Sequence, residues 1–170
     1  MNIYWILLIG ISIASWVVQY VLKKRFEKYS QVSISMTGKE GAEQMLRDSG
    51  ITDVRVGCVA GSLTDHYNPT DKTLNLSESV YGCANIAAAA VAAHECGHAV
   101  QHARGYAFLR MRSAMVPAVS FASKWVTWII MGGIFLINVF PQLLAIGVCL
   151  FAVTTLFSFV TLPVEIDASS

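Results

Sequence analysis

Long uncharged stretches alternate with polar ones along this chain, and their lengths predict three membrane-spanning helices. Residues 3–22 contain no charged residue, and about 20 apolar residues suffice for a helix to cross a bilayer. Residues 125–163 also contain none. This second stretch is too long for one span and suits two, with Pro141 near its middle. We therefore expect a transmembrane anchor over residues 1–22 and a transmembrane helical hairpin over residues 120–163.

The polar stretch between them, residues 23–119, is the part of the chain that can form a soluble domain. Thr37 and Glu40 have the spacing of a capping box, which predicts a helix that ends near Asp48. Residues 54–59 and 72–76 alternate between apolar and polar side chains, as half-buried strands do, and a turn signal lies between them. We expect these two strands to form a hairpin. The predicted class is α+β and mainly helical.

An alanine-rich segment over about residues 85–104 predicts one more helix, which Gly105 ends. A third membrane span is the alternative for this segment. However, only the ten residues before His94 are consistently uncharged, and polar side chains follow from His94 to Arg104. Because a span needs about 20 apolar residues, we interpret the segment as a buried helix of the polar domain.

Composition agrees with a membrane protein. The chain is 55% hydrophobic and 14% charged, whereas soluble domains are roughly 45–50% apolar and about 25% charged. This excess excludes a disordered chain. The net charge of +1 makes nucleic acid a poor partner, because nucleic-acid binding needs a basic face. The four cysteines do not form a dense disulfide pattern and are interpreted as free thiols of a reducing compartment.

The basic residues predict the orientation of the spans. Lys and Arg accumulate on the cytoplasmic side of membrane helices. A cluster over residues 23–28 follows the first apolar stretch, and no basic residue precedes it, which favours a retained anchor over a cleaved signal peptide. Further basic residues precede the hairpin. We therefore expect residues 23–119 to face the cytoplasm, with residues 164–170 returning there as a tail.

The helix over residues 85–104 carries the chemistry. Residues 94–98 read His-Glu-Cys-Gly-His, an H-E-x-x-H match. Residues four apart lie on one face of a helix, so His94 and His98 can bind one zinc ion. Glu95 lies about 100° around the helix and can flank the ion without binding it. There it can act as a general base toward a zinc-activated water.

Catalytic zinc takes three protein ligands, and the chain offers several candidates for the third. His102 lies a further turn along the helix, too far to share the ion. His66, in a predicted loop, could be a ligand or stabilise the transition state. Glu165 and Asp167 follow the hairpin, on the side of the membrane that holds His94. Spacing alone does not choose between a ligand and a polar span end for these two carboxylates.

The residues also resemble the YugP-type membrane zinc metallopeptidases. The resemblance implies a zincin-like cytoplasmic domain of gluzincin type in the bacterial plasma membrane, with one Zn²⁺ per chain held by His94, His98 and Glu165. It implies Glu95 as general base and places Asp167 as a carboxylate that orients a ligand. The family sequence is expected to continue beyond residue 170. The resemblance rests on ordered segments over nearly the whole chain: residues 36–38, 63–69, 74–77, 80–81, 89–102, 112–117 and 162–169.

Together these features predict a membrane-anchored zinc-dependent endopeptidase, whose partners are the lipid bilayer and a protein or peptide substrate. We expect the substrate to lie along the 72–76 strand by backbone pairing. The alternative is a non-catalytic membrane protein that binds or senses zinc. Glu95 distinguishes the two, because a pure binding site has no need of it. Oligomeric state is open at this stage.

Overall fold

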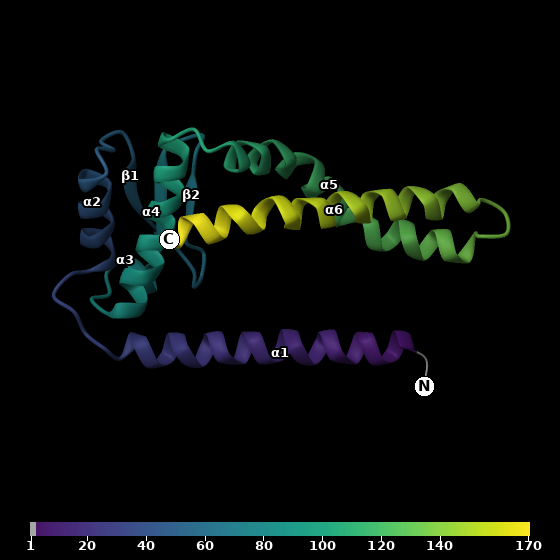
Figure 1. Cartoon of the computed structure of the whole chain (residues 1–170), viewed down its shortest axis with the longest axis horizontal. Helices are drawn as coiled ribbons and strands as arrows, with labels where there is room; N and C mark the ends of the chain where they lie inside the picture. The colour runs from purple at the N-terminus through teal and green to yellow at the C-terminus, as the bar shows by residue number, and fades with distance from the viewer. Residues whose placement is uncertain (1–2) are drawn as a thin grey trace. The chain divides into compact units, whose positions relative to one another are not determined.

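The computed structural model describes residues 3–170 and divides into two compact units. The first ends at Cys96 and the second comprises Gly97–Ser170. The boundary falls inside one helix, α4 (Ile86–Ala103), which therefore contributes residues to both units. The described chain is mainly helical with one small sheet, in agreement with the predicted class (Figure 1).

The first unit begins with a long helix and a short capped one. Helix α1 (Ile3–Ser30) contains the apolar stretch of the predicted anchor. Helix α2 (Gly38–Asp48) starts at the predicted capping box, in which Thr37 accepts from the Glu40 backbone and the Glu40 carboxylate accepts from the Thr37 backbone. These two bonds satisfy amide groups that the first turn leaves unpaired. The predicted end at Asp48 is confirmed.

The sheet differs from the predicted hairpin. It contains β1 (Arg55–Val59), β2 (His66–Asn68) and β3 (Thr73–Ser77) in the order β1-β3-β2. Strands β1 and β3, at the positions of the two predicted strands, are parallel. The antiparallel partner of β3 is the three-residue strand β2. The predicted turn does reverse the chain, but between β2 and β3, and β2 is too short for alternation to reveal it.

The same arrangement contradicts the predicted docking of a substrate along β3. A peptide extends a sheet by pairing with a free edge strand. Strand β3 lies in the middle of the sheet and pairs with both neighbours. Its Leu74 and Leu76 side chains are fully buried. Strand β3 is therefore a core element.

The core of the first unit is made of buried residues from β3 and three helices. Val80 of the short helix α3 (Glu78–Tyr81) and Ala42 of α2 are fully buried, like the two leucines of β3. Helix α4 contributes small residues, Ala88 and Ala92, each 1% exposed. The alanine-rich segment is thus a packed helix, as its sequence predicts. It ends next to Gly105, whose φ of 65° is a left-handed conformation that favours glycine.

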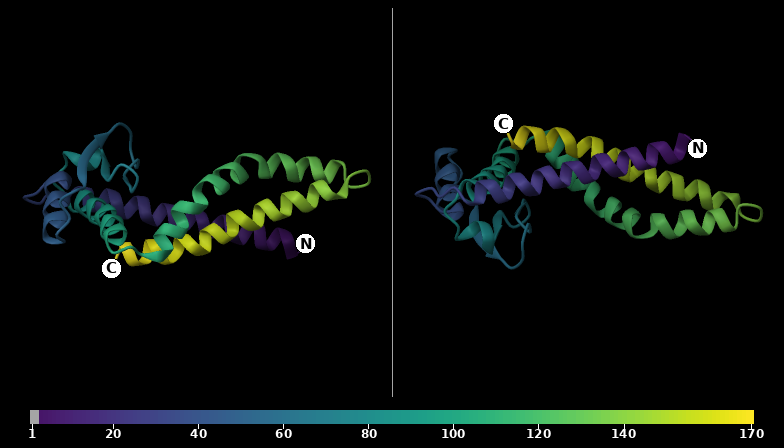
Figure 2. Two further views of the ribbon diagram at one scale, coloured as in Figure 1. Left: turned by 90° about the horizontal axis from the view of Figure 1, so that it is seen from above. Right: turned by 90° about the horizontal axis from the view of Figure 1, so that it is seen from below.

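The second unit is dominated by two long helices. Helix α5 (Ala107–Phe135) and helix α6 (Pro141–Ala168) are joined by a short turn and run antiparallel, side by side (Figure 2). Helix α5 contains Pro117 and bends along its length, because a proline inside a helix removes a backbone bond and clashes with the preceding turn.

Glycines let the two arms of this hairpin approach closely. A Cβ atom at Gly133 would lie 2.8 Å from the backbone of Leu144, and one at Gly147 would lie 2.7 Å from the Ile130 side chain. Small residues at such contacts are typical of helix pairs in membranes, where close backbone approach replaces the hydrophobic effect.

Three helices of the described chain are long and apolar enough to cross a membrane: Trp5–Ser30, Ala107–Phe135 and Pro141–Ala168. The two hairpin helices extend beyond the bounds expected from charge alone. Helix α5 begins before Ser120, and α6 continues through Pro163 into the predicted tail. A helix of 28 residues is about 42 Å long, and the hydrocarbon core is about 30 Å thick. Each helix is therefore longer than a perpendicular crossing of the hydrocarbon core requires.

Candidate metal centre

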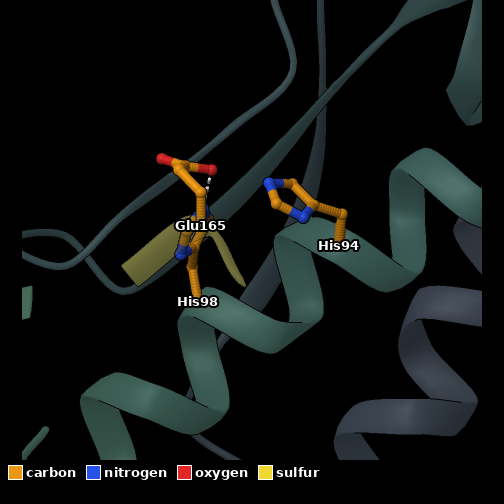
Figure 3. A group of neighbouring side chains, drawn as sticks. All are labelled: His94, His98 and Glu165. Carbon is orange, nitrogen blue, oxygen red and sulfur yellow. Dashed lines mark ion pairs between the residues drawn. The ribbon is translucent and has the colours of Figure 1, made fainter. Parts of the chain in front are cut away.

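Helix α4 positions the two histidines of the H-E-x-x-H motif. Because the helix is continuous from Ile86 to Ala103, His94 and His98 lie one turn apart on the same face. His98 is 6% exposed, whereas His94 is half-buried. Figure 3 shows both imidazoles projecting from α4.

The last turns of α6 bring a carboxylate to these histidines. An oxygen of Glu165 lies 3.6 Å from Nε2 of His98. The ligand atoms of His94, His98 and Glu165 all lie within 4.8 Å of one another, and Figure 3 marks the ion pair between His98 and Glu165. Among the described residues, these three side chains are the group that could hold a metal ion. Of the two acidic candidates, Glu165 joins the group and Asp167 does not.

The trio fits zinc by the chemistry of its donors. Two imidazole nitrogens and one carboxylate oxygen form a common ligand set of catalytic zinc, which leaves a fourth position open. Bonds of about 2.0–2.1 Å in a tetrahedron place ligand atoms roughly 3.4 Å apart. The separation of 3.6 Å between His98 and Glu165 is close to that value. Small side-chain adjustments suffice for the residues to hold the ion.

A buried glutamine, Gln101, fixes the orientation of His98. Its Oε1 lies 3.0 Å from His98 Nδ1, and its Nε2 donates to the Val164 carbonyl and to the Asp167 carboxylate, each at 2.8 Å. Since two acceptors hold the amide nitrogen, the amide oxygen faces the histidine and accepts its proton. Nδ1 of His98 therefore carries the proton that Gln101 accepts, and Nε2 is the nitrogen that faces Glu165.

Sequence reasoning missed Gln101. Its signal was weak: a polar residue one turn after His98 on a helix reads equally well as a solvated position. Gln101 is 4% exposed, and two of its three partners, Val164 and Asp167, belong to the end of α6, which lies far along the chain. The family resemblance predicts that Asp167 orients a metal ligand. In the structure Asp167 contacts Gln101, and Gln101 in turn contacts the candidate ligand His98.

Arg112 holds the other side of the Glu165 carboxylate. A nitrogen of Arg112, on α5, lies 3.3 Å from Oε1 of Glu165, while Oε2 is the oxygen near His98. Both side chains are about one-third exposed. In the sequence analysis Arg112 is one of the basic residues before the hairpin and begins one segment of the family resemblance, with no role assigned to it. The structure gives it a specific contact with a candidate ligand.

Glu95 and Cys96, which lie between the two histidines and carry reactive side chains, are both buried. Glu95 is 8% exposed and is not part of the trio, which suits a group that flanks the ion. Cys96 is 1% exposed, and its thiol points at the Ala42 carbonyl. Burial raises the pKa of Cys96 to about 12. The thiol is therefore protonated at neutral pH and does not offer the thiolate that metals bind.

Gly97 lets the end of α6 approach α4. A Cβ atom at this position would lie 2.2 Å from the carbonyl oxygen of Ala168 and 2.9 Å from its Cα. Both obstructing atoms belong to the backbone, so a side-chain movement cannot relieve the clash. Because Gly97 has no Cβ atom, the last turn of α6 comes close enough to α4 for Glu165 to reach His98.

Two other histidines remain outside the trio. His66 begins β2, where its Nδ1 donates to the Thr64 carbonyl at 2.8 Å and its Nε2 accepts from Asn75 at 3.1 Å. These bonds anchor its ring to the sheet, and its role in the transition state stays a prediction. His102 lies one turn beyond His98 on α4, as expected for a residue that does not share the ion.

Comparisons with known proteins relate the whole chain to one family. Residues 4–170 match the model of a family described as "Putative neutral zinc metallopeptidase". The chain is also 42% identical over 163 residues to "Putative membrane protease YugP" of Bacillus subtilis strain 168. That alignment covers 95% of this chain and 71% of the relative. No solved structure matches.

Proposed function

Because this chain belongs to the neutral zinc metallopeptidase family, we propose that it is a zinc-dependent endopeptidase embedded in the bacterial plasma membrane. In this proposal His94, His98 and Glu165 bind one zinc ion per chain, and Glu95 is the general base. The observation that carries the proposal is the meeting of a carboxylate from α6 with two histidines of α4, with all ligand atoms within 4.8 Å of one another.

Zinc bound by this trio would polarise the peptide carbonyl and lower the pKa of a water molecule. The chain's own residues supply the remaining functions. Glu95 accepts the proton of the attacking water and passes it to the leaving amine, since a carboxylate beside the ion can act as base and then as acid. Its burial keeps bulk water from competing for that proton.

Gln101 and Arg112 hold the ligands in place. Gln101 keeps Nδ1 of His98 protonated, so that Nε2 is the nitrogen available to the metal. Arg112 binds one oxygen of Glu165 and leaves the other directed at His98. We further propose that Asp167 steadies the Gln101 amide, and that His66 stabilises the transition state.

The membrane arrangement in this proposal follows the charges. Residues 23–119 form a zincin-like domain on the cytoplasmic side, anchored by residues 1–22 and followed by the hairpin. The basic residues in the last turns of α1 and in the first half of α5 support this orientation. The substrate is then a protein or peptide that reaches the membrane surface from the cytoplasm.

Metal content of the detergent-purified protein tests the ligand set. Wild type should contain about one zinc per chain, measured by elemental mass spectrometry, and Glu165→Ala should lose most of it, because two histidines alone bind zinc weakly. Asp167→Asn is the control, since its side chain can still accept from Gln101 and it is not in the trio. Full zinc in Glu165→Ala would move the third ligand elsewhere.

The role of Glu95 separates a protease from a zinc-binding protein. Glu95→Gln should retain zinc and lose proteolysis by about 10²–10⁴-fold, the contribution typical of a general acid–base group. A chelator should abolish the wild-type activity, and added zinc should restore it. If wild type holds zinc and Glu95→Gln cleaves peptides as well as wild type does, the proposed mechanism is wrong.

A further inference from the structure

An apolar groove lies between α1 and α4 and ends at one of the candidate ligands. Its volume is about 360 Å³, near the lower end of the range for ligand sites. Helix α1 lines it with Leu22, Phe26 and Tyr29, and helix α4 lines it with Ala90, Val91 and His94. Leu22, Phe26 and Tyr29 are four and three residues apart, and His94 lies four and three residues after Ala90 and Val91, so each set lies on one face of its helix.

Backbone bonds hold the two walls of the groove together. The amide of Ile86 donates to the Val32 carbonyl, and the amide of Ile34 donates to the Ala84 carbonyl, each at 3.0 Å. These bonds tie the segment after α1 to the start of α4, so that the end of one helix lies beside the beginning of the other (Figure 1). The groove is therefore built into the first unit and needs no other part of the chain.

Small side chains on α4 create the space. Ala87 and Ala90 both line the groove, and a larger residue at either position would fill part of it. Ala90 is exposed, whereas Ala87 is 5% exposed and belongs to the packed side of the helix. The alanine-rich sequence before the motif thus has a consequence beyond helix formation.

We infer that this groove receives an apolar side chain of the peptide substrate, next to the bond that is cleaved. The inference rests on the proposed peptidase function. His94 belongs both to the groove wall and to the candidate metal trio. A peptide whose carbonyl lies at the metal would therefore have a neighbouring side chain within reach of the groove. Its apolar lining selects residues such as Leu, Ile, Met or Phe.

The charges around the groove favour a peptide side chain over a lipid tail. The uncharged stretch of α1 ends at Leu22, and Lys23, Lys24 and Arg25 follow at once. Such residues mark the interface of a membrane span. Phe26 and Tyr29 follow these three basic residues, beyond the uncharged stretch of the helix. Arg25 lines the groove as well and keeps it close to water.

Cleavage specificity tests the inference. Wild type and Ala90→Leu would be incubated with a peptide library made from a digested proteome, and the cleaved bonds would be mapped by mass spectrometry. Wild type should cleave beside large apolar residues. Ala90→Leu should retain zinc and lose cleavage at those bonds by about tenfold or more, because the larger side chain fills part of the groove and one methylene in an apolar pocket is worth about 10–200-fold. Ala103→Leu, at an exposed position of the same helix, should cleave like wild type.

Peptide binding gives a readout that does not depend on turnover. In the inactive Glu95→Gln background, a fluorescent peptide with Leu at the preferred position should bind more tightly than its Ala counterpart. Adding Ala90→Leu should remove that difference. If Ala90→Leu retains zinc with wild-type preference and binding, the groove assignment is overturned while the proposed function stands. If zinc-loaded wild type cleaves nothing in the library, both are overturned.

Discussion

Gln101 joins a candidate ligand to the end of a distant helix. One amide group accepts from His98 and donates to two acceptors of α6, the Val164 carbonyl and the Asp167 carboxylate. Its side chain is buried, and a buried polar group that loses its partners destabilises its surroundings. Gln101 therefore affects both the orientation of His98 and the docking of α6.

We predict that Gln101→Met weakens zinc binding by about 10–100-fold, the usual cost of losing a residue that supports a metal ligand. Methionine has a similar size but makes none of the three hydrogen bonds of the glutamine amide. The His98 ring therefore loses the partner that fixes its tautomer. Competition with a chelator of known affinity measures the effect. Asp167→Asn should bind zinc nearly as wild type does. Wild-type affinity in Gln101→Met would mean that the hydrogen bond to His98 does not support the metal.

Gly97 decides how closely two elements approach each other. Glycine in the middle of a helix costs roughly 0.5–1 kcal/mol relative to alanine, so its presence needs a compensating reason. That reason is the Ala168 backbone, which occupies the place of a Cβ atom. The crossing of α4 and the end of α6 depends on this one missing side chain.

We predict that Gly97→Ala lowers both zinc content and thermal stability, although alanine favours the helix itself. The new methyl group must push the last turn of α6 away, and Glu165 moves with it. Gly132→Ala is the matched control, because its Cβ atom would meet only the Leu143 side chain at 3.6 Å. Zinc content and unfolding temperature in detergent would be compared. Unchanged zinc in Gly97→Ala would show that α6 tolerates the displacement.

Helix positions followed from local sequence far better than strand partners did. The capping box of α2 and the glycine after α4 act within a few residues, and both predictions hold. The hairpin of β1 and β3 was wrong because a parallel pair and an antiparallel pair have the same alternating pattern. Pairing depends on β2, whose three residues carry too little pattern to be found.

At the scale of the whole molecule, the charges on the chain predict one orientation in the membrane. Basic residues occupy the last turns of α1 and the first half of α5. The turn between α5 and α6 contains no charged residue. The positions of the basic residues and the uncharged turn both favour an orientation in which residues 23–119 face the cytoplasm.

We predict that Cys58 is protected from a membrane-impermeant maleimide in intact cells and becomes labelled after permeabilisation. Cys58 is exposed on β1, and the variant would carry serine at Cys83 and Cys149. Cys96 does not interfere, because it is buried and its pKa is raised to about 12. A cysteine at Asn138, in the α5–α6 turn, should show the opposite pattern. Labelling of Cys58 in intact cells would reverse the proposed orientation.

The amino-acid sequence was sufficient for every feature that depends on neighbouring residues. Length and hydropathy identified the three candidate spans, and helical spacing paired His94 with His98 and set Glu95 beside them. These features are local, because each depends on one turn or one stretch of chain. From the residues alone, Glu165 remained one of several candidates, and the family resemblance singled it out.

Tertiary structure decided what depends on contacts between distant segments. It brought Glu165 close to His98, and it placed the Asp167 carboxylate within hydrogen-bond distance of Gln101. It also explained Gly97 by a backbone that arrives from the far end of the chain. The physical reason is that such contacts depend on how packed helices cross. A sequence records the periodicity of each helix, but not the point at which two helices meet.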